Sequence, residues 1–336
     1  MKVGIIGATG VLGREIVSAF SDSGDIRDEF LGNDPPLLLS SGQSAGETFQ
    51  WLDDEELVVE VYSPDVVRGL DVALLAVPAP AVPAIAARLR ELGITAVDAS
   101  RTYRATAPLF FDEAPRPANL TGAPLVALPS AESLALARIL VALEAFEPLS
   151  VRATILKAAS GAGQAGVTDL AEGTGRLLNG QEPENPVHGH RLAFNLIPQA
   201  GAFVGADAEA ELELARDLTK LLGRPIGSAA TVAWAPWFFG DFLSITLRFS
   251  ALVDLASVRG RLSDRAHLKL VDDPASTVYP MPALATGDDA VLVGRLRADP
   301  LDSHAIQLVA VMDGARASAA HAVEAFCAVS RARHAH

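Results

Sequence analysis

The chain has 336 residues, of which half are apolar and a fifth are charged. This length predicts about two domains, and this composition is typical of a folded globular protein. The formal charge of −14 argues against a nucleic-acid partner, because phosphate recognition requires a basic face. The same charge repels anionic membranes, and no uncharged apolar run reaches the roughly 18 residues of a membrane span.

The sequence contains one cysteine, Cys327, which cannot form an internal disulfide. A reducing compartment is therefore favoured. Residues 1–7 are typical of a strand that enters a turn rather than of a secretory signal, so we expect a cytoplasmic protein. Cys327 lies in a helical pattern over residues 315–329, where apolar spacing predicts that the thiol is in a hydrophobic core.

Apolar segments and helical periodicities alternate along the first 128 residues. The apolar segments cover residues 2–6, 37–41, 72–77 and 96–99, and the helical segments cover residues 10–20 and 82–92. This alternation predicts a parallel sheet with helices on its faces. The acidic run at residues 53–56 is expected to be a solvated loop.

From about residue 150 the pattern changes to period 2, with apolar and polar residues alternating over 243–250. Residues 291–296 and 306–312 look like two more half-buried strands. We expect an open or antiparallel sheet with one face covered by helices over 166–178 and 210–222. The helix over residues 315–329 has no partner in this neighbourhood, and we expect it to return to the first domain.

Three glycines, Gly7, Gly10 and Gly13, follow the first expected strand and open the first expected helix. In a dinucleotide-binding loop such glycines permit the tight turn, the approach of the pyrophosphate and close helix–strand contact. The spacing G-x-x-G-x-x-G only partly meets the usual fingerprint, so a structural turn without a ligand remains an alternative. The loop residues expected to contact the cofactor are Gly7, Thr9, Gly10, Val11 and Leu12.

The second expected strand should be followed by a residue that reads the ribose, an acid for NAD or an arginine for NADP. Residues 40–46 instead read Ser-Ser-Gly-Gln-Ser-Ala-Gly, so neither charge is present. We expect Ser41, Gln43 and Ser44 to contact the cofactor. The choice between NADP and NAD stays open, and without a guanidinium on the 2′-phosphate the affinity is expected to be low.

Eight collinear segments of the chain resemble the aspartate-semialdehyde dehydrogenase family. They are residues 7–13, 40–46, 98–104, 159–163, 194–198, 236–240, 293–295 and 313–320. Within the family the chain looks closest to the degenerate Usg-type homologues, because Ala-Pro-Trp-Phe-Phe-Gly-Asp at residues 235–241 is similar to their motif.

This resemblance implies an α/β, Rossmann-like nucleotide-binding domain formed by residues 1–128 and 314–336. An α+β dimerisation domain is inserted at residues 129–313, and the protein is expected to be a homodimer with the C-terminal helix docked on the first domain.

The resemblance also implies a reaction, the reversible phosphate-linked conversion of aspartate semialdehyde to aspartyl phosphate with NADP. The family uses a cysteine nucleophile, a histidine base and an arginine that clamps the substrate carboxylate. In this sequence Ala131 matches the cysteine, Asp241 the histidine and Trp234 the arginine. Glu213 falls near an expected lysine, and Gly314 falls on an asparagine beside the nicotinamide.

Other positions of the family pattern are retained. Arg104 is expected either to bind an anion or to be a surface cation. Ser160 and Gly161 are expected to contact the cofactor as an anion nest or to form a packing turn. Glu211 is retained as a vestigial catalytic position. No metal site is expected, because residues 188–190 (His-Gly-His) lack a third ligand and fit a polar loop.

The sequence therefore predicts a non-catalytic or redirected family member that still binds a dinucleotide or small anion. One alternative is an NAD(P)-dependent oxidoreductase on another aldehyde or oxo substrate, with Asp241 or Glu211 as the acid. A second alternative is a non-catalytic dimer partner of an active relative. The aromatic cluster of Trp234 and residues 237–239 is expected either to line an apolar pocket or to fill the vacated site.

Overall fold

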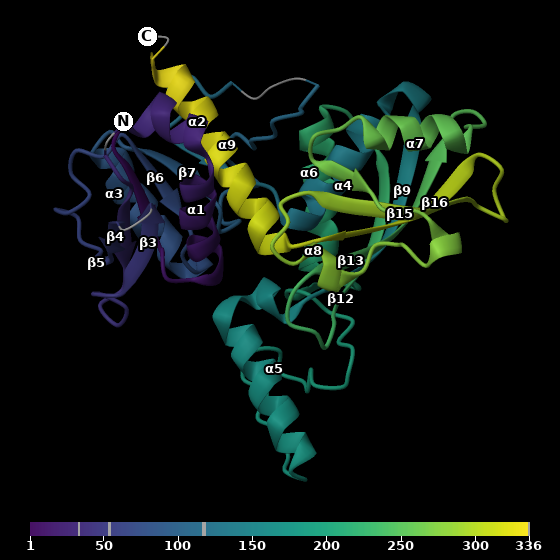
Figure 1. Cartoon of the computed structure of the whole chain (residues 1–336), viewed down its shortest axis with the longest axis horizontal. Helices are drawn as coiled ribbons and strands as arrows, with labels where there is room; N and C mark the ends of the chain where they lie inside the picture. Colours follow the sequence, from purple (N-terminus) through teal and green to yellow (C-terminus); the bar gives the residue numbers. More distant parts are fainter. Residues whose placement is uncertain (33, 53–54, 116–118, 335–336) are drawn as a thin grey trace. The chain divides into compact units, whose positions relative to one another are not determined.

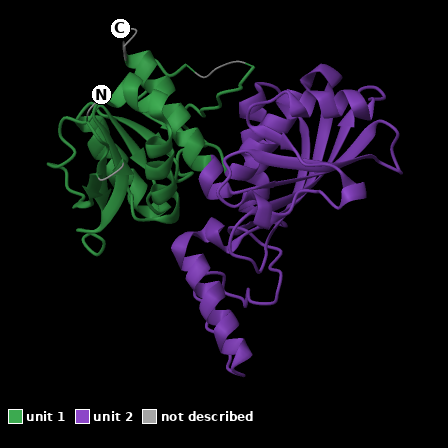
Figure 2. Cartoon of the chain, viewed as in Figure 1, with its two compact units in different colours: residues 1–130, 318–336 green, residues 131–317 purple. Residues whose placement is uncertain are grey.

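The computed structural model describes residues 1–32, 34–52, 55–115 and 119–334. The chain forms two compact units, residues 1–130 with 318–336 and residues 131–317 (Figure 2). We call them unit 1 and unit 2 and describe each by itself. No described helix is both long and apolar enough to cross a membrane.

Unit 1 contains a six-stranded sheet with the order β5-β2-β1-β6-β7-β8 (Figure 1). Its strands are β1 (Val3–Ile6), β2 (Leu37–Ser40), β5 (Glu60–Val61), β6 (Val72–Leu75), β7 (Thr95–Asp98) and β8 (Leu125–Ala127). All five pairings are parallel, which confirms the α/β prediction. The order of strands reverses at β1, between β2 and β6, and such a switch point is where doubly wound sheets bind ligands.

The helices of unit 1 lie against this sheet. They are α1 (Val11–Asp22), α2 (Gly24–Ile26), α3 (Val82–Glu91) and the C-terminal part of α9 (Gly314–His334), with short helical turns at Arg27–Leu31 and Ala79–Ala81. Phe326 of α9 packs edge-on against Phe20 and Phe30, at ring-centroid distances of 5.3 and 5.7 Å. Cys327 is buried in the same core. The expected return of the last helix to the first domain and the burial of the thiol are therefore confirmed.

A two-stranded antiparallel ribbon also belongs to unit 1. It consists of β3 (Thr48–Leu52) and β4 (Glu55–Val58). The expectation of a loop at residues 53–56 is wrong for Glu55 and Glu56, which begin β4, whereas residues 53–54 lie outside the described residues. The strand forms because Leu57 is buried on one face while both glutamates remain exposed to water.

Unit 2 contains a second six-stranded sheet, with the order β12-β9-β13-β16-β15-β14. Its strands are β9 (Pro148–Lys157), β12 (Gly227–Trp234), β13 (Asp241–Phe249), β14 (Leu268–Leu270), β15 (Val291–Ala298) and β16 (Ala305–Met312). β13 shows the expected alternation from Leu243 to Phe249, where the apolar side chains are buried and the polar ones are more exposed. The sheet is mixed rather than purely antiparallel, because β12 pairs with β9, and β14 with β15, in parallel.

The helices of unit 2 have two different environments. α4 (Ala131–Ala142) packs against α6 (Glu209–Leu222) and α7 (Leu255–Ser263), and α6 and α7 contact the sheet. Ten of the twelve residues of α4 are buried, so this helix is enclosed on nearly all sides. The shorter elements are α8 (Pro282–Ala285), β10 (Phe203–Val204), β11 (Asp207–Ala208) and turns at Glu144–Phe146, Ala159–Ala162 and Pro274–Ser276.

α5 (Gly163–Leu178) departs from the expected arrangement. It projects away from the sheet of unit 2 instead of covering it (Figure 1). Only Gly166, Leu170 and Gly173 are buried along its length, because its apolar stripe is narrow. Leu170 packs against Leu192 and Ala193 of the following segment. The expectation that the helix at residues 166–178 covers the sheet is therefore wrong, whereas α6 does pack against it.

Candidate functional site

The glycine loop of unit 1 lies at the switch point of its sheet. Gly7 has a φ of +95°, and a Cβ there would be 2.5 Å from the carbonyl oxygen of Ala76. A Cβ on Gly13 would be 2.0 Å from the carbonyl oxygen of Gly7. Gly7 and Gly13 are thus required by packing. Gly10 is different, because the nearest atom to its Cβ would be 3.5 Å away, an ordinary contact.

The backbone of this loop is held by β2. The amides of Gly7 and Ala8 both donate to the carbonyl oxygen of Leu39, at 2.8 and 3.1 Å. Gly10 is the N-cap of α1, it has no side chain that caps the helix, and no acidic residue lies in the first helical turn. The first amides of a helix have no acceptor within it and attract anions. The predicted contact residues Thr9, Val11 and Leu12 therefore surround a helix N-terminus suited to a diphosphate.

The turn after β2 carries the predicted ribose contacts. Ser41 and Gln43 are exposed, and the amide of Ser44 donates to the carbonyl oxygen of Ser41 at 3.2 Å. A cation that the sequence analysis missed lies beside the glycine loop: Arg14 of α1 donates from Nε to the Thr9 carbonyl oxygen at 3.0 Å. Its Nη2 is 2.6 Å from Oε2 of Glu47. In NADP-binding folds the arginine that holds the 2′-phosphate usually follows the second strand. Arg14 instead belongs to helix α1, and the Glu47 carboxylate partly neutralises its charge.

Arg104 lies in a loop that Asp98 organises at the end of β7. The Asp98 carboxylate accepts hydrogen bonds from the amides of Ser100 and Tyr103, each at 2.9 Å. Arg101 has a left-handed φ of +76°, which turns the chain just before Arg104. Arg104 is 5% exposed, so the alternative of a surface cation is wrong. Binding of an anion by this buried guanidinium stays a prediction.

In unit 2 the structure brings together three residues from the sequence analysis: the predicted counterparts of the catalytic cysteine and histidine, and that of the asparagine beside the nicotinamide. Ala131 begins α4, Asp241 begins β13 and Gly314 begins α9. A Cβ on Gly314 would be 2.8 Å from Oδ2 of Asp241 and 3.4 Å from the Ala131 Cβ. Asp241 is buried, and its Oδ1 accepts a hydrogen bond from the Ala158 amide at 2.7 Å. The three positions are far apart in sequence and meet at one point.

A buried ion pair lies beside this point. Lys157, the last residue of β9, pairs through Nζ with Oε1 of Glu132, the neighbour of Ala131. The two side chains are 7% and 5% exposed. The sequence analysis did not predict this pair or any role for Lys157. The available signal was a lysine at an otherwise apolar position of a period-2 pattern, next to the segment at 159–163.

Trp234 lies over the lysine of this pair. Lys157 and Trp234 are partners in the register between β9 and β12, and Nζ is 5.6 Å from the centroid of the indole ring. His188 packs on the same indole, with ring centroids 4.7 Å apart. Burial lowers the pKa of His188, and the nearby Asp169 carboxylate partly opposes this change. Residues 188–190 are therefore not a purely polar loop, because His188 packs against an aromatic ring.

The rest of the aromatic cluster does not fill the vacated site. Phe238 and Phe239 are each 42% exposed, so they lie at the surface. Trp237 is partly buried and donates from Nε1 to the carbonyl oxygen of Gly240 at 2.7 Å. Of the four aromatic residues, Trp234 is the one that contacts the buried ion pair.

The two other retained positions have local structural roles. Glu211 accepts hydrogen bonds from the amides of Ala208 and Val232, at 2.8 and 3.0 Å. Each of its two carboxylate oxygens therefore binds one backbone N–H group. The amide of Ser160 donates to the carbonyl oxygen of Phe238 at 3.0 Å. A Cβ on Gly161 would be 3.1 Å from the Trp234 ring. These contacts favour a packing turn at residues 159–163, and contact with a cofactor stays a prediction.

Two family models match the chain, one for each domain. The model for "Semialdehyde dehydrogenase, NAD binding domain" matches residues 2–128, and the model for "Semialdehyde dehydrogenase, dimerisation domain" matches residues 140–316. Together with the fold, they define a two-domain α/β protein of the nucleotide-binding dehydrogenase class. The chain belongs to the semialdehyde dehydrogenase family.

Individual relatives agree with this assignment. The chain is 29% identical to an aspartate-semialdehyde dehydrogenase of Prochlorococcus marinus, covering 95% of this chain and 93% of the relative. It is 31% identical to a USG-1 protein homolog of Pseudomonas aeruginosa, covering 95% and 94%. The fold is similar to that of aspartate semialdehyde dehydrogenase II from Vibrio cholerae, with a TM-score of 0.86, 24% identity and 98% coverage of both chains. The resemblance inferred from the sequence motifs is confirmed.

Proposed function

We propose that this family member does not catalyse the phosphorylating oxidation of aspartate semialdehyde at a useful rate. The contact between Ala131, Asp241 and Gly314 carries the proposal. A methyl group stands where the nucleophile is expected, and a methyl group cannot form a thioester. Loss of a covalent nucleophile from a comparable acyl-transfer site costs about 10⁶-fold in rate, or about 8 kcal/mol of barrier.

The neighbouring side chains offer no replacement for that chemistry. Lys157 is paired with the Glu132 carboxylate, which favours the ammonium form over the nucleophilic amine. Trp234 presents an indole in place of the arginine that would hold a carboxylate. Glu211, a candidate acid of the alternative oxidoreductase, uses both oxygens to accept backbone hydrogen bonds. These contacts favour a protein that acts through binding.

A coupled assay tests the loss of activity. Phosphate-dependent reduction of NADP on aspartate semialdehyde should stay far below about one turnover per second, the lower end of ordinary enzymes. A restored variant, Ala131→Cys with Asp241→His and Trp234→Arg, should form a covalent acyl-enzyme detectable by mass spectrometry, whereas Trp234→Arg alone should not. Turnover of the unaltered chain at about one per second or faster would contradict the proposal.

We also propose that the glycine loop of unit 1 binds NADP or NAD. The family model for an NAD-binding domain, the uncapped N-terminus of α1 and the absence of a packing requirement for glycine at Gly10 support this. Calorimetric titration with NADP, NADPH and NAD should detect binding. Gly10→Val should weaken it, whereas Gly260→Val, at an exposed position of α7 with no atom within 4 Å of a Cβ, should not. Absence of binding at millimolar concentrations of all three would contradict the proposal.

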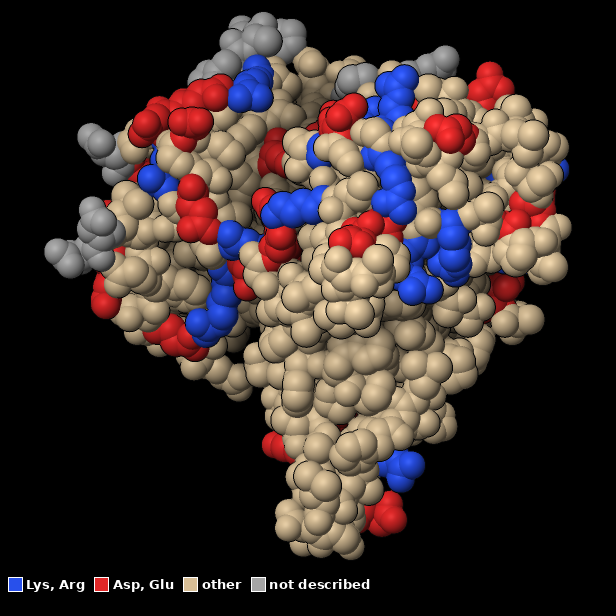
Figure 3. All heavy atoms as spheres, turned by 45° about the vertical axis from the view of Figure 1, so that its right-hand side comes forward, with Lys and Arg blue, Asp and Glu red and all other residues tan. Residues whose placement is uncertain are grey.

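A homodimer is proposed for the assembly. The family model of the second domain is a dimerisation domain, and the segment at residues 163–208 exposes large apolar side chains. These are Leu178, Phe194, Leu196, Phe203 and Val204. Figure 3 shows few charged side chains on the visible face of the projecting part of unit 2. Exposed large apolar side chains that form a contiguous patch usually mark an interface.

Light scattering coupled to size exclusion tests the assembly and should give twice the chain mass. Co-expression with an active relative separates the homodimer from the alternative of a mixed dimer. A strictly monomeric mass of the chain alone would refute the homodimer, and failure to co-purify with the co-expressed relative would refute the mixed dimer. The buried single thiol, Cys327, suits a reducing compartment such as the cytoplasm.

A further inference from the structure

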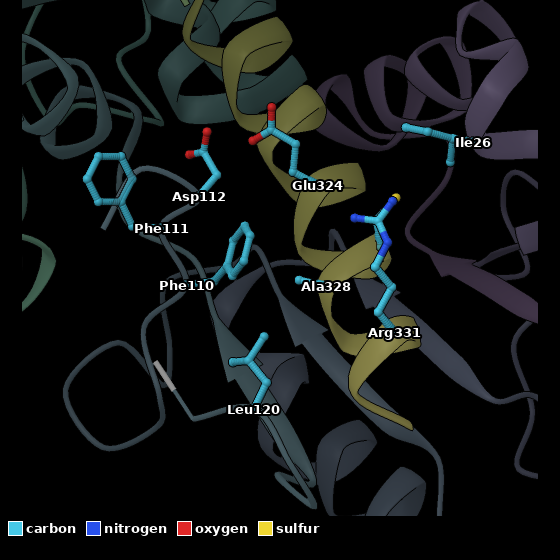
Figure 4. Close-up of a pocket in the computed structure, with 9 residues that line it drawn as sticks. Ile26, Phe110, Phe111, Asp112, Leu120, Glu324, Ala328 and Arg331 are labelled. Atoms are coloured by element: carbon cyan, nitrogen blue, oxygen red, sulfur yellow. The ribbon is translucent and has the colours of Figure 1, made fainter. Parts of the chain in front are cut away.

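A second cluster of titratable side chains lies in unit 1, at the edge of the core that α9 completes. His321 and Glu324 are three residues apart on α9, and Asp112 follows Phe110 and Phe111. Figure 4 shows the Asp112 and Glu324 carboxylates near each other at one end of a pocket. Nδ1 of His321 is 2.8 Å from Oε2 of Glu324 and 3.5 Å from Oδ1 of Asp112. One ligand atom from each of the three residues lies within 4.8 Å of the others.

The hydrogen bonding of His321 determines what this cluster requires. Its side chain is 1% exposed, and Nε2 is 3.1 Å from the carbonyl oxygen of Phe110. A carbonyl oxygen can only accept, so Nε2 carries the hydrogen. In the neutral ring Nδ1 then has a lone pair, which is directed toward two carboxylates that are also acceptors. Such an arrangement needs a cation between the three groups, either a proton on Nδ1 or a metal ion.

We propose that Asp112, His321 and Glu324 bind one divalent transition-metal ion of the Zn²⁺ type. One imidazole nitrogen and two carboxylate oxygens suit Zn²⁺, whereas Ca²⁺ and Mg²⁺ prefer oxygen ligands alone. A ligating histidine usually donates its other N–H to a carbonyl or carboxylate oxygen, as His321 does to Phe110. The ion would also balance the charge of the two carboxylates.

The distances are close to those of a bound ion. A tetrahedral ion with bonds of about 2.0–2.1 Å separates its ligand atoms by about 3.3 Å. The distance of 3.5 Å from His321 to Asp112 already fits, and the distance of 2.8 Å to Glu324 must increase by about half an ångström. The Glu324 side chain is 27% exposed, so it is not fixed on all sides by packing.

The site also has an entry path. Asp112 and Glu324 line a pocket of about 440 Å³ together with Phe110, Phe111, Cys327 and Arg331 (Figure 4). Three protein ligands leave the fourth tetrahedral position of the ion open for a water molecule, whereas closed structural zinc sites use four protein ligands. An ion bound between the two carboxylates would border this pocket, which gives the ion access to solvent.

Titration of the full-length protein with Zn²⁺ after chelation tests the proposal. We expect one ion per chain with a dissociation constant in the micromolar range or below, and visible d–d absorption when Co²⁺ replaces Zn²⁺. Asp112→Asn and Glu324→Gln should each weaken binding at least about tenfold. Glu29→Gln removes a carboxylate that pairs with Arg331 and should leave the affinity unchanged, as should a His334→Gln, His336→Gln variant.

The variant His321→Gln changes a buried residue, so far-UV circular dichroism must first show that it folds. If it does not fold, Asp112→Asn still tests the site, because Asp112 is partly exposed and its substitution should not prevent folding. Binding weaker than about 100 μM would overturn the proposal, as would an affinity that Asp112→Asn leaves unchanged. A ¹⁵N spectrum in which both nitrogens of His321 stay protonated at saturating Zn²⁺ would also overturn it, and would assign the cation to a proton.

Discussion

Removal of one partner from the buried pair of Lys157 and Glu132 should strongly destabilise unit 2. The change Glu132→Gln removes the carboxylate that pairs with Lys157, while the Lys157 side chain stays buried, with 7% of its surface exposed. Breaking a buried pair in this way typically costs about 3–5 kcal/mol, because desolvation of the remaining charge is no longer compensated. The stacking of Lys157 on Trp234 remains and offsets about 0.5–2 kcal/mol of this at most.

The double variant Lys157→Met, Glu132→Leu provides the matched control. It removes both charges but keeps the apolar volume, so its stability should lie within about 1 kcal/mol of the unaltered protein or above it. Scanning calorimetry and urea unfolding followed by circular dichroism measure the difference. After the offset from Trp234, the single variant should lose about 1–4.5 kcal/mol. Since 1 kcal/mol corresponds to about 2–4 °C in a domain of about 150–250 residues, it should melt about 2–18 °C lower.

The reasoning would be refuted by a single variant that loses less than about 1 kcal/mol, the range of exposed ion pairs. That result would mean that water reaches the lysine, and that the site beside Ala131 is open. A double variant as unstable as the single one would instead indicate that the pair supplies packing rather than charge compensation.

Three further predictions concern single residues. Gly13→Ala should destabilise unit 1 by at least about 1–3 kcal/mol, because its Cβ would overlap the Gly7 carbonyl oxygen. Gly10→Ala is the control and should be nearly neutral in thermal melts. Equal losses of stability at the two positions would contradict the loop geometry. Glu211→Gln should lower stability by about 1–2 kcal/mol, because an amide cannot accept from both backbone N–H groups, and should leave dinucleotide binding unchanged in calorimetry. Burial raises the pKa of Cys327 from 9.0 to about 11. Alkylation should therefore keep accelerating above pH 9, and the stability that burial of the neutral thiol provides should be lost between pH 9 and 11; a rate that levels off near pH 9 would contradict this.

Part of unit 1 could be predicted from the sequence: the strands β1, β2, β6 and β7 are short apolar runs, and the helices α1 and α3 have their own periodicity. The strands β4 and β5 gave no such signal, because they are polar or very short. The same reasoning predicted the burial pattern of β13 from Leu243 to Phe249. It failed for α5, because periodicity identifies an apolar stripe but not the element that covers it. For α5 that element is the neighbouring segment around Leu192 rather than the sheet.

The candidate site was only partly predictable for a similar reason. The motifs identified Ala131 and Asp241, and the structure brings these positions together. Motifs gave no sign of the pair between Glu132 and Lys157, because neither residue indicates its distant partner. Arg14 was missed because its side chain reaches the glycine loop from a helix, a direction that the spacing rule for the second strand does not consider.

The packing of α9 has a consequence for the order in which the chain folds. Phe20 and Phe30 are made well before their aromatic partner Phe326, and the whole of unit 2 is made between them. Residues 131–317 form a compact unit and can close beforehand. The part of unit 1 that precedes unit 2 therefore keeps an unfinished interior until α9 has been made, and during that interval it is exposed to aggregation and to chaperones.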